Sequence, residues 1–223
     1  MDLTNYVPQL IRCLILMFTS EDQKTLQEAW NALLAVTKNL DPSDLMVYVS
    51  DVRQAVRFAV SDVNKSTGGG GGGSGEVTIP GFCLAKGIQP VLPIFRESIL
   101  NGQPDVKEQA AKGLSEVISV SNADALKPSV VHITGPLIRI LGDRFPSNVK
   151  TAVLDTLASL LKKASVLLKP FFPQLQVYSL VQFFVCFFVK IVIDLHSIID
   201  DPSSGKLCIV LFSFLIATLR YYS

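Results

Sequence analysis

Two stretches of this chain, 93–118 and 136–161, share one order of residue types. The first reads PIFRESILNGQPDVKEQAAKGLSEVI and the second reads PLIRILGDRFPSNVKTAVLDTLASLL. At an offset of 43 residues, proline aligns with proline and one Val-Lys pair aligns with another. After each Val-Lys pair, apolar residues recur every three or four positions, which predicts an amphipathic helix. Each unit should therefore hold a proline-marked helix, a short turn and a second helix.

A period of this length with paired helices is typical of HEAT and armadillo arrays. Because one helix pair cannot bury its own apolar faces, such units stack and share a continuous core. Residues 8–36 resemble a further unit in weaker register, and 166–176 begin another. We therefore expect an all-α chain, a HEAT-repeat helical solenoid fragment with a long Gly-rich loop and an apolar helical tail.

The chain divides into four segments by composition. Six consecutive glycines at 68–73 predict a flexible linker, and no Gly-Lys-Ser/Thr follows them as a phosphate loop would require. Ser20, with Gln23 three residues on, resembles a capping box and predicts a helix over 21–39. The expected segments are N-terminal HEAT-like helices at 1–64, the Gly-rich loop at 65–78, HEAT repeats at 79–176 and the apolar tail at 177–223.

The composition argues against several classes of function. With 20 basic and 19 acidic residues the net charge is +1, so bulk charge gives no reason to expect nucleic acid or an acidic membrane as a partner. None of the four cysteines forms a CxxC pair, and both histidines lie far from them in sequence. No catalytic motif is present. We expect no catalytic residue, no metal site and no cofactor.

The start of the chain lacks the pattern of a signal peptide, which favours a cytoplasmic protein.

Six motifs carry a resemblance to a known family. They are IPGFCL (79–84), VLPI (91–94), KEQAAKGL (107–114), KPSVV (127–131), ITGPLIRILGDRFP (133–146) and LKPFFPQLQ (168–176). This part of the chain resembles the large HEAT-repeat translational activator of the general-control amino-acid response, which is related to fungal elongation factor three. Residues 1–64 are compatible with the repeats just upstream, but match less specifically.

The resemblance implies a scaffold rather than an enzyme. The family binds ribosomes, the N-terminal domain of the kinase of initiation factor two's alpha subunit, and an ATP-binding-cassette co-activator. It has no small-molecule substrate. The alternative is a generic HEAT adaptor, such as a transport or phosphatase scaffold, and the stretch Gly135 to Pro146 favours the translational activator.

Five charged residues are candidates for partner binding. Arg139, Asp143 and Arg144 would form a charged ridge at the end of a first helix, and the alternative is a local ion pair at a helix C-terminus. Lys107 and Lys150 open the two second helices, which in helical solenoids line the surface where partners bind. The alternative for these lysines is a solvated helix face.

Composition changes abruptly at Gln176–Val177. The 47 residues that follow hold 30 apolar residues and no glutamate, and alanine occurs 13 times before this point but once after it. Many exons end in CAG, which encodes glutamine, and introns begin with GT, which encodes valine when in frame. The bias and the Gln-Val pair predict that 177–223 is non-homologous, translated intron sequence.

A membrane anchor is the second interpretation of this tail. Its apolar stretches at 177–189 and 207–219 are shorter than the roughly 20 residues of a spanning helix. A packed cap on the last repeat is the third, although caps normally present a polar outer face. Because the expected second helix does not follow 166–176, we predict that Leu157, Leu160 and Leu161 lack a partner helix.

Overall fold

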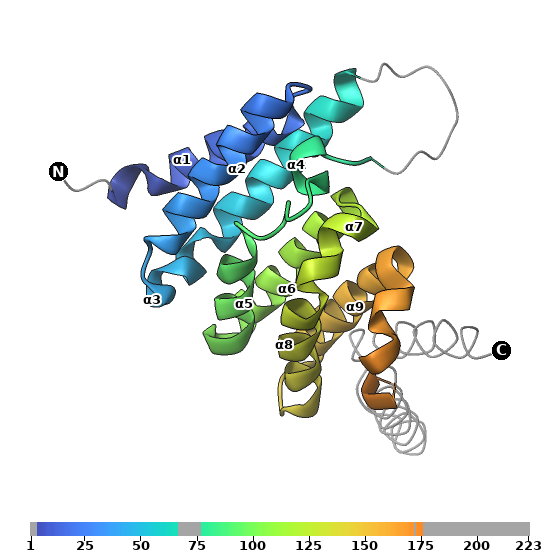
Figure 1. Cartoon of the computed structure of the whole chain (residues 1–223). Coiled ribbons are helices and arrows are strands. Elements are labelled where there is room, and N and C mark those ends of the chain that lie inside the picture. The colour runs from blue at the N-terminus through green and yellow to red at the C-terminus, as the bar shows by residue number, and fades with distance from the viewer. Residues whose placement is uncertain (1–3, 67–76, 172, 176–223) are drawn as a thin grey trace, which may run out of the picture.

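The computed structural model describes residues 4–66, 77–171 and 173–175 (Figure 1). This part of the chain is built from helices and short 3-10 turns, without a strand, as the sequence predicts. The glycine run at 68–73 and the tail at 177–223 lie outside the described residues, and so do the predictions made for them.

Nine α-helices follow one another along the described residues (Figure 1). Their bounds are α1 Val7–Leu16, α2 Gln23–Lys38, α3 Pro42–Leu45, α4 Val49–Ser66, α5 Leu92–Asn101, α6 Pro104–Val120, α7 Ala123–Leu126, α8 Val130–Gly142 and α9 Ser147–Leu168. Two short 3-10 turns matter for the packing, η2 at Met17–Thr19 and η4 at Pro80–Cys83.

The repeat predicted from the sequence is confirmed, with one addition. One unit consists of η4, α5 and α6, and the next consists of α7, α8 and α9. Each therefore has a short helical turn in front of the two expected helices. Equivalent helices stack: α1, α4, α6 and α9 are successive neighbours in one row, and α5 packs on α8 in another. Two main helices per unit, each pair preceded by a short helical turn, fit the HEAT and armadillo class of arrays.

Aromatic packing joins the parts of the chain on either side of residues 67–76. The rings of Phe18 and Phe82 meet edge to face with centroids 5.1 Å apart. Gly81 makes this possible, because a Cβ there would lie 2.3 Å from the Phe18 ring. Nearby, the indole N–H of half-buried Trp30 donates to the Lys86 carbonyl at 2.9 Å. The two parts therefore share one core.

The start of α2 corrects one expectation. Asp22, rather than Ser20, is the N-cap, and its carboxylate accepts from the backbone N–H groups of Thr25 at 2.9 Å and Lys24 at 3.4 Å. A carboxylate also interacts favourably with the positive end of the helix. The hydroxyl of Thr25, followed by the two backbone donors, lowers the pKa of Asp22. Ser20 instead accepts from the Asp22 N–H.

The last unit corrects a second expectation. Leu157 and Leu160 are fully buried and Leu161 is 8% exposed, so these residues do not lack partners. The backbone leaves helical geometry at Ala164, where φ is −139° and ψ is 40°. Beyond this kink, Leu168 and Leu175 join the same core as the three leucines. The three leucines therefore belong to a core that continues on both sides of the kink.

Candidate protein-interaction site

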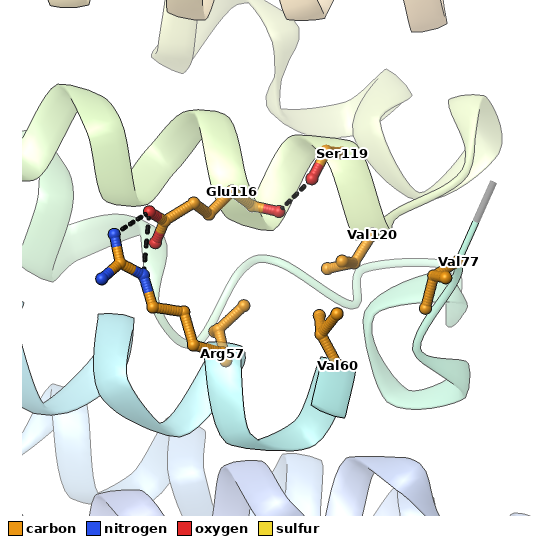
Figure 2. A pocket seen from close by; sticks show the side chains of 7 residues that line it. Arg57, Val60, Val77, Glu116, Ser119 and Val120 are labelled. Atoms are coloured by element: carbon orange, nitrogen blue, oxygen red, sulfur yellow. Dashed lines mark hydrogen bonds and ion pairs between the residues drawn. The ribbon is translucent and has the colours of Figure 1, made fainter. Parts of the chain in front are cut away.

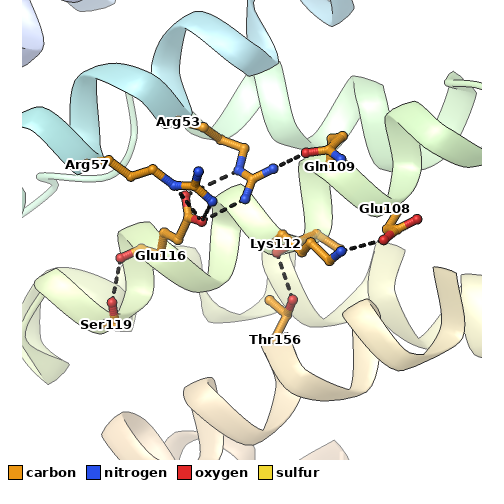
Figure 3. Close-up of polar contacts among 9 residues, drawn as sticks. Arg53, Arg57, Glu108, Gln109, Lys112, Glu116, Ser119 and Thr156 are labelled. Atoms are coloured by element: carbon orange, nitrogen blue, oxygen red, sulfur yellow. Dashed lines mark hydrogen bonds and ion pairs between the residues drawn. The ribbon is translucent and has the colours of Figure 1, made fainter. Parts of the chain in front are cut away.

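Two arginines of α4 converge on one carboxylate of α6 (Figure 3). Arg53 and Arg57 are four residues apart, so their side chains lie on one helix face. Arg53 makes a two-pronged contact with Glu116, Nη2 to Oε1 at 2.7 Å and Nε to Oε2 at 3.2 Å. Arg57 reaches Oε1 through Nη2 at 2.7 Å and Nε at 3.2 Å. We name these three residues the arginine clamp.

The members of the arginine clamp differ sharply in exposure. The side chain of Arg53 is 10% exposed and that of Glu116 27%, whereas that of Arg57 is 63% exposed. Burial raises the pKa of Glu116, but the hydrogen bonds from both arginines outweigh it, and the pKa ends below its ordinary value. Glu116 therefore stays ionised at neutral pH. One carboxylate shared by two guanidiniums leaves a net positive charge, and Arg57 exposes it to solvent.

A glycine in the middle of α6 lets Arg53 cross the helix. A Cβ on Gly113 would lie 2.6 Å from Cγ of Arg53 and 2.6 Å from the Phe95 ring. Glycine inside a helix costs about 0.5–1 kcal/mol relative to alanine, so its presence here indicates a packing requirement. Having crossed Gly113, Arg53 also donates through Nη1 to the side-chain oxygen of Gln109.

The contact between α6 and α9 is tied by neutral hydrogen bonds. The buried Thr156 hydroxyl donates to the Ala111 carbonyl at 2.8 Å (Figure 3). The hydroxyls of Ser115 and Ser159 lie 2.9 Å apart. At the edge of this contact, Glu108 accepts from Lys112 on its own helix and from Asn148 at the start of α9. These bonds fix the register of the two helices.

Two hollows lie beside the arginine clamp. The first, of about 340 Å³, is largely apolar and is shown in Figure 2. Its lining residues are Val56, Arg57, Val60, Val77, Glu116, Ser119 and Val120. The second, of about 410 Å³, is lined by Ser50, Arg53, Gln54, Arg57, Phe58, Ser61 and Gln109. Arg57 lines both hollows, and the surface of each is mostly apolar.

The charged ridge predicted from the sequence lies at the far end of the array. Arg139, near the end of α8, is exposed, and so are Asp143 and Arg144 in the turn that follows. Lys150 is half-buried on α9 and has interactions within the fold. The structure thus leaves the ridge accessible, and its role in partner binding stays a proposal.

Lys107 is placed differently from the prediction. Its side chain is buried, with 4% of the residue exposed, and Nζ donates at 2.7 Å to the carbonyls of both Ile99 and Leu100. The last carbonyls of a helix lack intrahelical partners, and the ammonium satisfies those of α5. It also lies 5.0 Å from the centre of the Phe145 ring. Lys107 therefore serves packing, and the expectation that it faces a partner is corrected.

Lys107 is nevertheless linked to the ridge. Burial lowers its pKa, the negative charge of Asp143 opposes that shift, and the positive charge of Arg139 adds to it. Its ring contact is with Phe145, next to Arg144 in the chain. Lys107 thus supports the turn that carries two of the exposed ridge residues.

The arginine clamp could not be found from spacing. Arg53 and Arg57 at positions i and i+4 indicate a shared face, but Glu116 lies 63 residues beyond Arg53. Within a repeat array that separation corresponds to helices in neighbouring units, and only the packing of α4 on α6 shows which residues meet.

Among the described residues, no group of three or more His, Cys, Asp or Glu side chains could hold a metal ion. Nor does any helix in that part of the chain have the length and apolarity needed to cross a membrane. The two described cysteines, Cys13 and Cys83, are free thiols.

Comparison with known proteins supports the resemblance seen in the sequence. A model described as "Stalled ribosome sensor GCN1-like, HEAT repeats" matches residues 1–86. The human "Stalled ribosome sensor GCN1" is 46% identical over 176 residues, 78% of this chain. The Arabidopsis thaliana "Protein ILITYHIA" is 42% identical over 174 residues, and the Saccharomyces cerevisiae "eIF-2-alpha kinase activator GCN1" is 35% identical over 176. The chain is a partial GCN1-like HEAT-repeat protein.

The GCN1-like matches cover a small part of the relatives, and the family model covers part of this chain. The chain spans 6% of the length of each of these relatives. The family model covers the N-terminal part, where the sequence motifs were least specific. No solved structure matches the chain.

Proposed function

We propose that this chain acts as a cytoplasmic interaction scaffold in ribosome-linked activation of the kinase that phosphorylates initiation factor two's alpha subunit. The similarity to GCN1 relatives over 78% of the chain carries this proposal, since those relatives are named as a ribosome sensor and as a kinase activator. The chain would work by binding rather than by catalysis. Its partners would be the ribosome, the N-terminal domain of the kinase and an ATP-binding-cassette co-activator.

The ridge of Arg139, Asp143 and Arg144 is the surface we assign to these partners. All three side chains are exposed, and they follow one another at the end of α8 and in the next turn. The ammonium of Lys107 contacts the ring of Phe145, the residue next to Arg144 in this turn. A charged turn that already packs on the fold is suited to binding a partner, because its residues would lose little conformational freedom in the complex.

Two binding measurements test the proposal with the full 223-residue chain. Co-sedimentation with purified ribosomes measures the first interaction, and capture by the immobilised kinase N-terminal domain measures the second. The ridge variant Arg139→Glu/Arg144→Glu should weaken at least one of them by about tenfold. Loss of a well-placed charge at an interface typically costs 1–2 kcal/mol.

The matched control reverses two exposed basic charges elsewhere. Arg96 on α5 and Lys127 before α8 are both exposed, so Arg96→Glu/Lys127→Glu changes the net charge equally. The control should bind as the unmodified chain does. If neither the ribosome nor the kinase domain retains the unmodified chain, the proposed function is wrong. If the two double variants lose binding equally, the ridge is wrong as the contact surface.

A further inference from the structure

The surface between α4 and α6 has a charge imbalance that the ridge does not share. The larger hollow beside the arginine clamp is lined by two arginines, four uncharged polar residues and one phenylalanine, with no carboxylate. Glu116 already accepts from both arginines. A second carboxylate, Glu108, interacts electrostatically with Arg53 and is paired with Lys112, so these three cations exceed the two carboxylates. An incoming carboxylate would therefore meet a net positive charge and no lining group that repels it.

Arg57 is the cation available to such a group. Its side chain is 63% exposed, against 10% for Arg53. It contacts Glu116 through Nε and Nη2, both at Oε1. A guanidinium can bind a second carboxylate through its remaining N–H groups, because five donors are arranged in a fixed fork.

Apolar side chains flank this cation on both sides. Phe58 follows Arg57 in α4, lines the larger hollow and is 56% exposed. On the other side, Val56, Val60 and Val120 line the smaller hollow (Figure 2). Aromatic residues and arginines are enriched in protein–protein contacts, where they supply most of the binding energy. The site thus offers one charge contact with an apolar contact on each side.

We infer that this groove docks an acidic peptide segment of a protein partner. A glutamate or aspartate of the segment would accept hydrogen bonds from Arg57, and neighbouring apolar side chains would pack on Phe58 and between the valines. Nucleic acid fits less well, because it needs a row of cations along its backbone and the groove has two that share Glu116. The inference uses none of the three ridge residues and does not depend on the proposed ribosome link.

Fluorescence anisotropy with the full chain tests the groove. The probe is a fluorescein-labelled peptide of alternating glutamate and leucine. Two companion peptides replace glutamate by glutamine or leucine by serine, and a single-stranded RNA oligonucleotide is the nucleic-acid arm. The glutamate–leucine peptide should bind more tightly than all three. Arg57→Glu should weaken it about fivefold or more, the upper range for one exposed ion pair. Phe58→Ser should weaken it without changing its dependence on salt.

The control is Arg96→Glu, an equal charge reversal at an exposed residue of α5. It should leave peptide affinity unchanged, and circular dichroism of every variant should match the unmodified chain. Because Arg57→Glu adds an acid beside Glu116, Arg57→Gln serves as a milder second variant. The inference is overturned if no peptide binds, if Arg96→Glu weakens binding as much as Arg57→Glu, or if the RNA binds more tightly than the peptide. These outcomes leave the ribosome and kinase measurements unaffected.

Discussion

Two of the contacts that helix α6 makes differ in character. Toward α9 it packs through small and branched residues, and hydroxyl bonds such as Thr156 to Ala111 set the register. Toward α4 it is joined by the arginine clamp, and two hollows remain beside the ion pairs. One side of the helix is therefore closely packed, while the other holds its neighbour by charge and keeps accessible space.

Shortening a buried leucine of α9 should have the largest effect on stability. Leu157 is fully buried within the core. Leu157→Ala should lower the free energy of unfolding by about 3 kcal/mol, because both the buried surface and the filled volume are lost. Urea denaturation followed by circular dichroism measures it. Val166, 64% exposed on the same helix, is the control, and Val166→Ala should change the value by less than about 0.5 kcal/mol. Equal effects would contradict the close packing described here.

A methyl group added to α6 should have the next largest effect. Gly113→Ala places a Cβ 2.6 Å from both Arg53 and the Phe95 ring, and overpacking of this kind costs about 2 kcal/mol. The matched variant is Gly135→Ala, since a Cβ there meets no atom within 4 Å. It should change stability by less than about 1 kcal/mol, because the helix preference of alanine is offset by the restriction that Pro136 places on the residue before it. Thermal melting compares the two. A stabilised Gly113→Ala variant would show that Arg53 does not need this crossing point.

The ionic contact with α4 should show a smaller, pH-dependent effect. Glu116→Gln should cost about 1.5 kcal/mol at neutral pH, because hydrogen bonds to a charged group are lost. Since the folded-state pKa of Glu116 lies below its ordinary value of 4.5, its stabilisation is present above that pH. It is lost as pH falls through the folded-state pKa. Urea denaturation at several pH values should show the difference between the variant and the unmodified chain shrinking in acid.

Asp155 on α9 has a pKa shifted in the opposite direction from that of Glu116. Burial raises its pKa, and the positive charge of Lys112 only partly opposes the shift. A carboxyl group with a raised folded-state pKa favours folding more as pH falls. Asp155→Asn should therefore cause no loss of stability at neutral pH. A pH-independent loss for Glu116→Gln, or a loss for Asp155→Asn, would argue against the assigned ionisation states.

The repeat architecture could be predicted from the sequence because it depends on local periodicity. Apolar residues at three- and four-residue steps after each Val-Lys pair became α6 and α9. Identical residues at equivalent positions were a weaker guide. Pro93 lies in the first turn of α5, whereas the aligned Pro136 lies inside α8, which begins six residues earlier at Val130. Proline is compatible with a first turn but not with regular hydrogen bonding in a helix interior. The helical residues of α8 that precede Pro136 are therefore not predicted by the alignment of the two prolines.

The candidate site was less predictable, since side-chain roles depend on neighbours distant in sequence. Lys107 has the sequence context of an exposed helix lysine, yet the C-terminal carbonyls of α5 bury it. Glu116 gains its importance from two arginines on a helix of the preceding unit. Arg139 near the end of α8 and Asp143 and Arg144 in the turn that follows are exposed, as residues at a turn between helices normally are, and their role in binding stays a prediction.

The contact of Trp30 with Lys86 gives the protein a built-in optical reporter. Trp30 is the only tryptophan in the sequence, and its indole donates to a carbonyl on the other side of residues 67–76. Its emission wavelength should therefore shift to the red when the helices before that segment separate from those after it. Intrinsic fluorescence can thus distinguish separation of the two parts from melting of α9, which circular dichroism alone would combine into one signal.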